Sequence, residues 1–167
     1  MKHLKIGACL LMLLGQWACS QDAKNGPPKK LLAEIQRYEA VAANNPTNYS
    51  ANYALSQLYT GYHLWLATNS MADVESYRKK ALASTESALS VAPNIYSRVF
   101  LAMTFEQLGE PDHALPIYKD FLVQAETNKG EILGNTEVDA RLRTKVQEES
   151  AALVSDVKRR VHAIESR

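Results

Sequence analysis

The sequence predicts an all-helical protein, and three observations carry this prediction. Apolar residues recur at intervals of three and four along successive stretches of the chain, as on the buried face of an α-helix. Asparagine, proline and glycine residues, which end helices, separate these stretches. The sequence contains neither the alternating apolar pattern of a β-strand nor an Asn-Gly turn between β-branched stretches. With 167 residues, 46% of them apolar, the chain is long enough for one domain with a substantial core.

The first three helices follow from the apolar pattern and its interruptions. The first is expected from residue 29 until an Asn-Asn-Pro sequence ends it at residues 44–46. The second begins near the proline of that sequence and reaches a polar break at residues 68–70. The third covers about residues 71–91, and Ser70 with Asp73 resembles a capping box at its start. We expect Trp65, near the end of the second helix, to be exposed.

Glycine and proline mark the boundary between the fourth and fifth helices. The fourth begins at Ile95 and ends at Gly109, which adopts a left-handed closing conformation without strain. Pro111 then occupies the preferred first-turn position of the fifth helix. Pro116 lies inside that helix and is expected to kink or delay it, because proline lacks the backbone N–H donor.

A loop at residues 127–135 precedes the last predicted helix, residues 136–167. Thr136 and Asp139 mark its start. It is longer than every earlier helix, so we expect its N-terminal half to cap the preceding helix pair. The alternative is that its apolar stripe pairs with another chain.

The N-terminus has the pattern of a secretory signal peptide over residues 1–18. Basic residues precede an apolar run at residues 6–17, and the small residue Ala18 follows that run. The run is too short to span a bilayer comfortably. Residues 19–28 are polar and end in Gly-Pro-Pro, which favours a flexible tether.

Residues 16–19 resemble the lipobox of bacterial lipoproteins, with Ala18 directly before Cys19. The resemblance implies that Cys19 carries a diacylglycerol and anchors the protein to a membrane, facing the periplasm. Ser20 stands where an aspartate would retain enterobacterial lipoproteins in the inner membrane, so the outer membrane is the expected location. The alternative is ordinary cleavage after Ser20, which would release a soluble periplasmic protein. Cys9 would leave with the signal peptide, so no disulfide is expected.

Residues 101–118 have the spacing of a tetratricopeptide repeat. The residues that carry this resemblance are Leu101, Ala102, Phe105, Gly109, Ala114 and Tyr118. In that family the small residues let two helices touch, aromatic residues fill the gap between neighbours, and the glycine makes the turn. A weaker match upstream consists of Leu55, Ser56, Tyr59, Ala81, Ala88 and Pro93, with Thr85 replacing an aromatic residue. The resemblance implies a short helical solenoid over residues 29–126 that the last helix caps.

Repeats of this family bind a peptide or a helix on the concave face that the first helix of each repeat lines. The resemblance places the following residues on that face: Tyr53, Gln57, Tyr96, Val99, Met103, Glu106 and Gln107. This set is apolar and rich in amides, and it lacks the lysines and asparagines with which chaperone-binding relatives hold a terminal carboxylate. We therefore expect a helix or extended protein segment held by packing.

The sequence offers no catalytic centre, metal site or cofactor motif. His63, His113 and His162 lie on three different predicted helices, and no second histidine follows four residues after any of them. Basic and acidic residues are nearly balanced, 19 against 18, which argues against nucleic-acid binding. The basic cluster at residues 158–160 suits either lipid headgroups or an acidic partner, although nearby acidic residues favour a mixed charged surface.

These observations predict a lipid-anchored periplasmic adaptor that binds a protein subunit of an envelope machine, such as a pilus or a secretion system, and helps to assemble or position it. One alternative is an envelope scaffold that dimerises through the last helix. Another is a regulatory subunit of a cell-wall enzyme. The oligomeric state stays open at this point.

Overall fold

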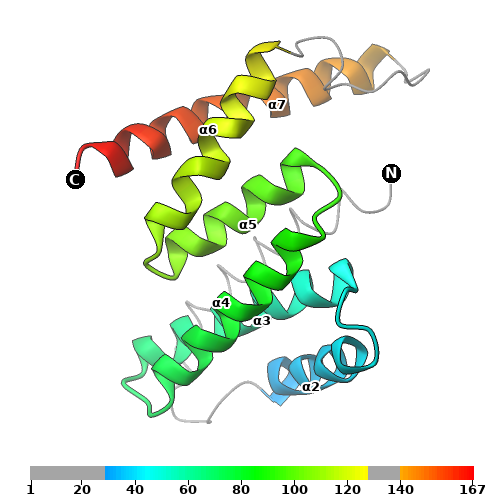
Figure 1. Ribbon diagram of the computed structural model, residues 1–167, viewed down its shortest axis with the longest axis vertical. Coiled ribbons are helices and arrows are strands. Elements are labelled where there is room, and N and C mark those ends of the chain that lie inside the picture. Colours follow the sequence, from blue (N-terminus) through cyan, green and yellow to red (C-terminus); the bar gives the residue numbers. More distant parts are fainter. Residues whose placement is uncertain (1–28, 128–139) are drawn as a thin grey trace. The chain divides into compact units, whose positions relative to one another are not determined.

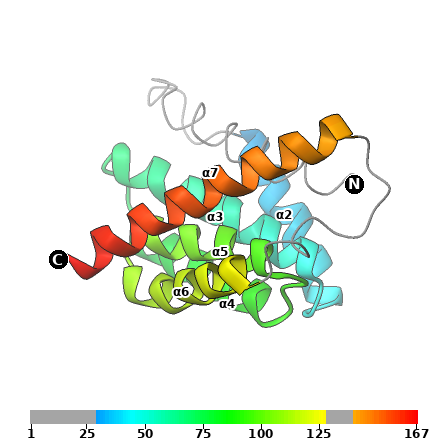
Figure 2. The same ribbon diagram turned by 90° about the horizontal axis from the view of Figure 1, so that it is seen from above.

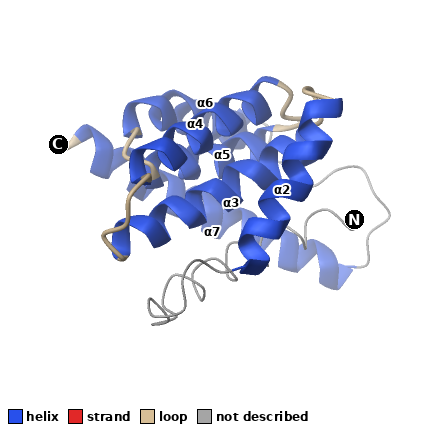
Figure 3. Cartoon of the chain, turned by 90° about the horizontal axis from the view of Figure 1, so that it is seen from below, coloured by secondary structure: helices blue, strands red, loops and turns tan. Residues whose placement is uncertain are grey.

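The computed structural model describes residues 29–127 and 140–167, and these ranges contain six α-helices and no strand (Figure 1, Figure 3). The all-helical class is thus confirmed for the described residues. The helices are α2 (Lys29–Asn44), α3 (Tyr49–Thr68), α4 (Val74–Ser90), α5 (Ile95–Gln107), α6 (Pro111–Thr127) and α7 (Ala140–Glu165). The predicted signal peptide, tether and most of the loop before the last helix lie outside the described residues. The helices form two compact units, with α2 to α4 in the first and α5 to α7 in the second.

The first unit is built around α3, which packs against both α2 and α4. Its core is therefore drawn mainly from α3, whose buried apolar residues are Ala51, Ala54, Leu55, Tyr59, Tyr62, Trp65 and Leu66. Trp65 is only 7% exposed, so the prediction that it is exposed was wrong. Its ring stacks on that of Tyr62 at 5.8 Å, and the ring of Tyr77 from α4 meets Tyr62 edge-on. An aromatic cluster of Tyr62, Trp65 and Tyr77 thus joins α3 to α4.

A pair of hydroxyl groups joins α3 to α4 where the helices approach closely. Ser56 Oγ lies 2.7 Å from Thr85 Oγ1, and both residues are fully buried. Thr85 also donates to the carbonyl of Ala81 one turn earlier in its own helix. The resemblance to tetratricopeptide repeats led us to expect an aromatic residue at position 85. In this chain the small hydroxyl of Thr85 instead satisfies the buried Ser56.

Two helix starts differ from the sequence prediction. The second helix begins at Tyr49 rather than near Pro46, because Asn48 has an extended backbone and its side chain caps the helix by accepting a hydrogen bond from Ala51 N at 3.0 Å. The predicted capping box of Ser70 and Asp73 was wrong. Both residues have positive φ angles, 51° and 68°, and the Asp73 side chain makes no capping hydrogen bond. The connection is therefore a left-handed turn, and α4 begins later than predicted, at Val74.

The α5–α6 pair forms as the sequence predicts. Asn94 caps α5 by accepting a hydrogen bond from Ser97 N at 2.9 Å. Gly109 has φ +78° and closes α5, and α6 starts at Pro111, so both predictions are confirmed. The helix then continues through Pro116 to Thr127, so this proline does not delay its start.

Small and aromatic residues lie between α5 and α6 as the repeat resemblance implies. Ala102, Ala114 and Tyr118 are fully buried, and Phe105 is 2% exposed. Neighbouring helices pack in pairs, α3 with α4 and α5 with α6, which is compatible with a helical-repeat fold.

The last helix packs against α6 within the second unit, and the two helices cross in the view of Figure 1; Figure 2 shows α7 from above. Its buried residues Val157 and Ile164 lie in its C-terminal half. The C-terminal half therefore packs against the preceding helices. The predicted capping by the N-terminal half stays a prediction, because its first side chains are not described. The side chains of residues 140–148, and the start signal of Thr136 and Asp139, lie outside the described part of the chain.

Candidate partner-binding surface

The seven residues predicted to line a binding surface lie on two helices in two units. Tyr53 and Gln57 belong to α3 in the first unit. Tyr96, Val99, Met103 and Glu106 belong to α5 in the second unit, as does Gln107, the last residue of that helix. The structure brings the five α5 residues together on one helix, and the two α3 residues form a separate set.

The α3 residues are largely enclosed by their own unit. Gln57 is 2% exposed, so its side chain belongs to the interior. Tyr53 is half-buried, and its ring lies 5.7 Å from that of Tyr49. Burial, with a smaller contribution from Tyr49, raises the pKa of Tyr53 to about 12. Tyr53 is therefore the member of this set with surface to offer a partner.

Four of the five α5 residues retain accessible surface. Val99 is fully buried and supports the helix from inside. Tyr96 is half-buried, with its ring 5.8 Å from Phe121 of α6. Met103 and Glu106 are also half-buried, and Gln107 is exposed. These four residues present an apolar, amide and carboxylate surface, which suits protein recognition.

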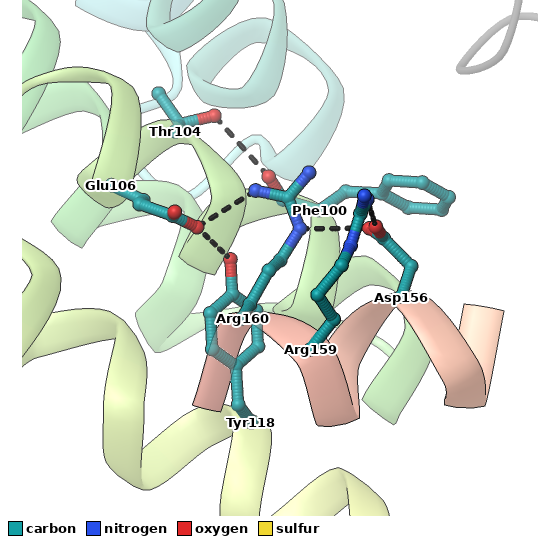
Figure 4. A network of polar contacts seen from close by, with 7 residues as sticks. All are labelled: Phe100, Thr104, Glu106, Tyr118, Asp156, Arg159 and Arg160. Atoms are coloured by element: carbon teal, nitrogen blue, oxygen red, sulfur yellow. Dashed lines mark hydrogen bonds and ion pairs between the residues drawn. The ribbon is translucent and has the colours of Figure 1, made fainter. Parts of the chain in front are cut away.

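Glu106 is the centre of a polar network that joins all three helices of the second unit (Figure 4). Its Oε2 atom accepts a hydrogen bond from the Tyr118 hydroxyl of α6 at 3.1 Å. The same atom accepts one from Nη1 of Arg160 of α7 at 2.8 Å. The side chains of Arg160 and Glu106 are 29% and 21% exposed, so this ion pair is partly withdrawn from water. A carboxylate predicted to face a partner thus already holds an arginine from the chain itself.

A second carboxylate orients Arg160. Asp156, one turn earlier on α7, accepts a hydrogen bond from Arg160 Nε at 2.7 Å and also pairs with Arg159 (Figure 4). Burial alone would raise the pKa of Asp156, but the hydrogen bonds and charges of the two arginines outweigh burial and lower it. Burial also opposes ionisation of Arg160, yet its two carboxylate partners raise its pKa, so the guanidinium stays charged.

The Tyr118 hydroxyl is held in its neutral form as the donor to Glu106. Burial is the largest cause of its raised pKa, and the negative charge of Glu106 adds to it, while Arg160 partly offsets both. Because Tyr118 is fully buried, its hydroxyl has a fixed position. The carboxylate of Glu106 is therefore oriented by a rigid donor before any partner binds.

Apolar side chains and ion pairs hold the C-terminal half of α7 in place. Burial of an aliphatic side chain such as Val157 or Ile164 contributes about 1.5–3 kcal/mol. Two further ion pairs reach α6, Lys119 with Glu165 at 2.6 Å and Lys158 with Glu126 at 3.7 Å. All four of these side chains are about half exposed, so each pair contributes only ~0–1 kcal/mol. The buried Val157 and Ile164, the half-buried Leu153, Val154 and Val161, and Arg160 therefore contribute more to the docking of this segment than the exposed ion pairs.

The basic cluster of residues 158–160 is used for ion pairs within the chain. Lys158 approaches Glu126, Arg159 approaches Asp156, and Arg160 approaches both Asp156 and Glu106. This pairing fits the interpretation of a mixed charged surface. Binding of lipid headgroups stays a prediction for the exposed Lys158 and Arg159.

Sequence reasoning missed a polar cluster that joins the three helices of the first unit. The Tyr59 hydroxyl donates to Glu39 Oε1 at 2.5 Å, and Lys80 Nζ lies 3.8 Å from the same oxygen. The ammonium group also lies over the Tyr77 ring, 4.9 Å from its centre. Burial, followed by the hydrogen bond and charge of Glu39, raises the pKa of Tyr59. Glu39, Tyr59 and Lys80 are 20 or more positions apart in the sequence, and no local pattern pairs them.

The described residues contain no cluster of three histidine, cysteine or acidic side chains that could hold a metal ion. His63 Nδ1 lies 2.9 Å from the carbonyl oxygen of Val74, where the ring ties α3 to the start of α4. His113 places its ring edge-on to Phe105 at 5.4 Å. Both histidines thus have packing roles, and His162 is exposed on α7.

Among the described helices, none is both long and apolar enough to cross a bilayer. Cys19, the predicted lipid attachment site, lies outside the described residues. A scan against protein-family models and searches of curated proteins and of solved structures found no match to this chain.

Proposed function

We propose that this protein is a lipid-anchored periplasmic adaptor that binds a protein partner and helps to assemble or position an envelope machine such as a pilus or a secretion system. The observation that carries the proposal is the accessible part of α5. Tyr96, Met103 and Gln107 offer apolar and amide surface beside the oriented carboxylate of Glu106. Such a combination recognises the side chains of a protein segment.

Photo-cross-linking in bacteria tests partner binding directly. Benzoylphenylalanine replaces Gln107, which is exposed on the proposed surface, or Val123, which is 59% exposed on α6 outside the predicted set. Irradiation of cells that carry the Gln107 replacement should yield a specific envelope-protein adduct, and the Val123 replacement should yield none or a different one. Identical adduct patterns, or no adduct from Gln107, would contradict the proposal.

The anchor is tested separately by intact mass and membrane partitioning. The wild-type chain should be processed at Cys19, carry a diacylglycerol and partition with membranes. Cys19→Ala should lose the lipid and the membrane association, and Cys9→Ala should retain both because that residue leaves with the signal peptide. An unlipidated wild-type product cut near Ser20 would refute the anchor and indicate a soluble periplasmic protein.

A scaffold that dimerises through the last helix, or a regulatory subunit of a cell-wall enzyme, would also suit an all-helical protein. No contact in the described structure favours either alternative. Val157 and Ile164 of α7 are already buried within the chain itself, which leaves less of the apolar stripe for a second copy.

A further inference from the structure

We propose that the surface of α5 and α6 beneath the C-terminal half of α7 is a binding site for an amphipathic helix that carries an arginine between two aliphatic anchors. The C-terminal half of α7 is the built-in occupant of this site, and the partner helix takes its place. This inference rests on the proposed function, because it specifies the kind of partner that the adaptor binds.

The receptor side of the site is prepared for an arginine. Glu106 Oε2 accepts from the fixed hydroxyl of Tyr118 at 3.1 Å and from Arg160 Nη1 at 2.8 Å. Tyr118 is fully buried, so the carboxylate keeps its orientation when the arginine departs. Any helix that delivers a guanidinium to this oxygen therefore meets a preorganised acceptor.

The occupant shows which pattern the site selects. Val157, Arg160 and Ile164 are spaced by three and four residues, which places them on one face of α7. Asp156 stands four residues before Arg160 and accepts from its Nε atom at 2.7 Å, which leaves Nη1 for Glu106. The predicted partner helix has an acid and then an aliphatic residue, an arginine three positions after the aliphatic residue, and a second aliphatic residue four positions later.

In the proposed exchange, the partner helix replaces the buried side chains Val157 and Ile164 and the Glu106 ion pair of α7. The pairs of Lys119 with Glu165 and of Lys158 with Glu126 are exposed to solvent and contribute less. The site also adjoins the accessible surface of α5. Met103 lies three residues before Glu106, one turn away on the same face of the helix.

A peptide-exchange experiment on the full chain tests this inference. The probe is a fluorescein-labelled synthetic peptide of residues 149–167, titrated with the full-length protein in detergent and followed by fluorescence anisotropy. An intramolecular helix competes with the peptide at high effective concentration. Arg160→Gln in the chain weakens that competitor, so the peptide should bind this variant about fivefold or more tightly than the wild type.

Arg159→Gln is the matched control, because Arg159 pairs with Asp156 of its own helix and is 79% exposed. The peptide should bind this variant as it binds the wild type. A peptide that itself carries Arg160→Gln should show no gain, and adding Glu106→Gln to the Arg160→Gln chain should remove the gain. Equal binding of the unmodified peptide to the wild-type, Arg159→Gln and Arg160→Gln chains would overturn the inference.

Circular dichroism of each variant checks that the chain is folded. If Arg160→Gln loses helix content, the peptide titration is repeated with Arg160→Lys. Lysine keeps the positive charge but lacks the planar guanidinium that contacts both carboxylates. If the peptide binds the Arg160→Lys chain more tightly than the wild type, by less than the roughly fivefold gain expected for Arg160→Gln, the inference is supported. If a folded Arg160→Lys chain binds the peptide no more tightly than the wild type, the inference is overturned. Failure of peptide binding with a persisting Gln107 cross-link would refute this site and leave the adaptor function standing. Peptide binding without any cross-link from Gln107 would support this site and contradict the adaptor function.

Discussion

Nη1 of Arg160 lies 2.8 Å from Oε2 of Glu106, although 54 residues separate the two in the sequence. This contact fixes the last helix on the α5–α6 pair. It also occupies a carboxylate that the sequence assigns to partner binding. The proposed binding surface therefore includes an oxygen atom that also holds α7 in place.

A double-mutant cycle measures the strength of this contact. Glu106→Gln and Arg160→Gln should each lower the free energy of unfolding, and the coupling energy between them should be about 1 kcal/mol, because both side chains are less than one-third exposed. Urea unfolding followed by circular dichroism gives the values. Arg159→Gln should change stability by less than about 0.5 kcal/mol, since its contact is local and exposed. If the effects of Glu106→Gln and Arg160→Gln on the free energy of unfolding are additive, the ion pair does not contribute to stability.

The buried hydroxyl pair of the first unit gives a second prediction. Thr85→Val keeps the shape of the side chain but leaves the buried Ser56 hydroxyl without its 2.7 Å partner, so it should cost about 1–3 kcal/mol. Ser56→Ala combined with Thr85→Val should recover part of this loss, because both polar groups are then gone. Ser87→Ala, an exposed position on the same helix, is the control and should change stability by less than about 0.5 kcal/mol. A Thr85→Val variant as stable as this control would show that the hydroxyl pair is unimportant.

Gly109 provides a third prediction, about backbone conformation alone. Its φ is +78°, and an added Cβ would meet nothing within 4 Å, so strain in the backbone is the only cost of a side chain. Gly109→Ala should destabilise the protein by about 1 kcal/mol in thermal or urea unfolding. Gly109→Asn should cost less, because asparagine tolerates the left-handed region better. Equal stabilities for all three chains would mean that the turn does not require this conformation.

A fourth prediction follows from the lowered pKa of Asp156. Because the folded pKa is below the ordinary value of 3.8, the ionised carboxylate contributes stability above that pH. This contribution is lost as the pH falls through the lowered pKa. The difference in unfolding free energy between the wild type and Asp156→Asn should therefore be constant near neutral pH and shrink below pH 3.8. A difference that stays unchanged down to about pH 2 would contradict the assigned ion pairs.

Local signals in the sequence predicted most of the helical framework. Apolar spacing located the helices, and Gly109 and Pro111 marked a boundary that the structure confirms. The start of α4 was mispredicted because Ser70 and Asp73 match a capping pattern, yet the turn needs left-handed backbone at both residues. Without a glycine, the sequence of a segment does not indicate that its backbone adopts the left-handed conformation.

Long-range contacts account for the remaining differences. Trp65 was expected to be exposed because the sequence does not show that Tyr62 stacks against it. The α5 part of the candidate surface could be assigned from repeat spacing, but the burial of Gln57 and Val99 depends on how neighbouring elements pack. Nor does any local pattern indicate that Arg160 pairs with Glu106, since each has other charged residues much closer in the sequence.

Affinity capture with one pair of matched variants tests the central claim, that the accessible surface of α5 binds a protein partner. Wild type, Met103→Glu and Val123→Glu are compared by quantitative mass spectrometry of proteins retained from a solubilised envelope fraction. Both substitutions place a carboxylate on a helix surface of the second unit, but only Met103 belongs to the proposed binding surface. The account predicts that wild type and Val123→Glu retain the same protein and that a folded Met103→Glu chain loses it. Equal retention by all three chains would contradict the account.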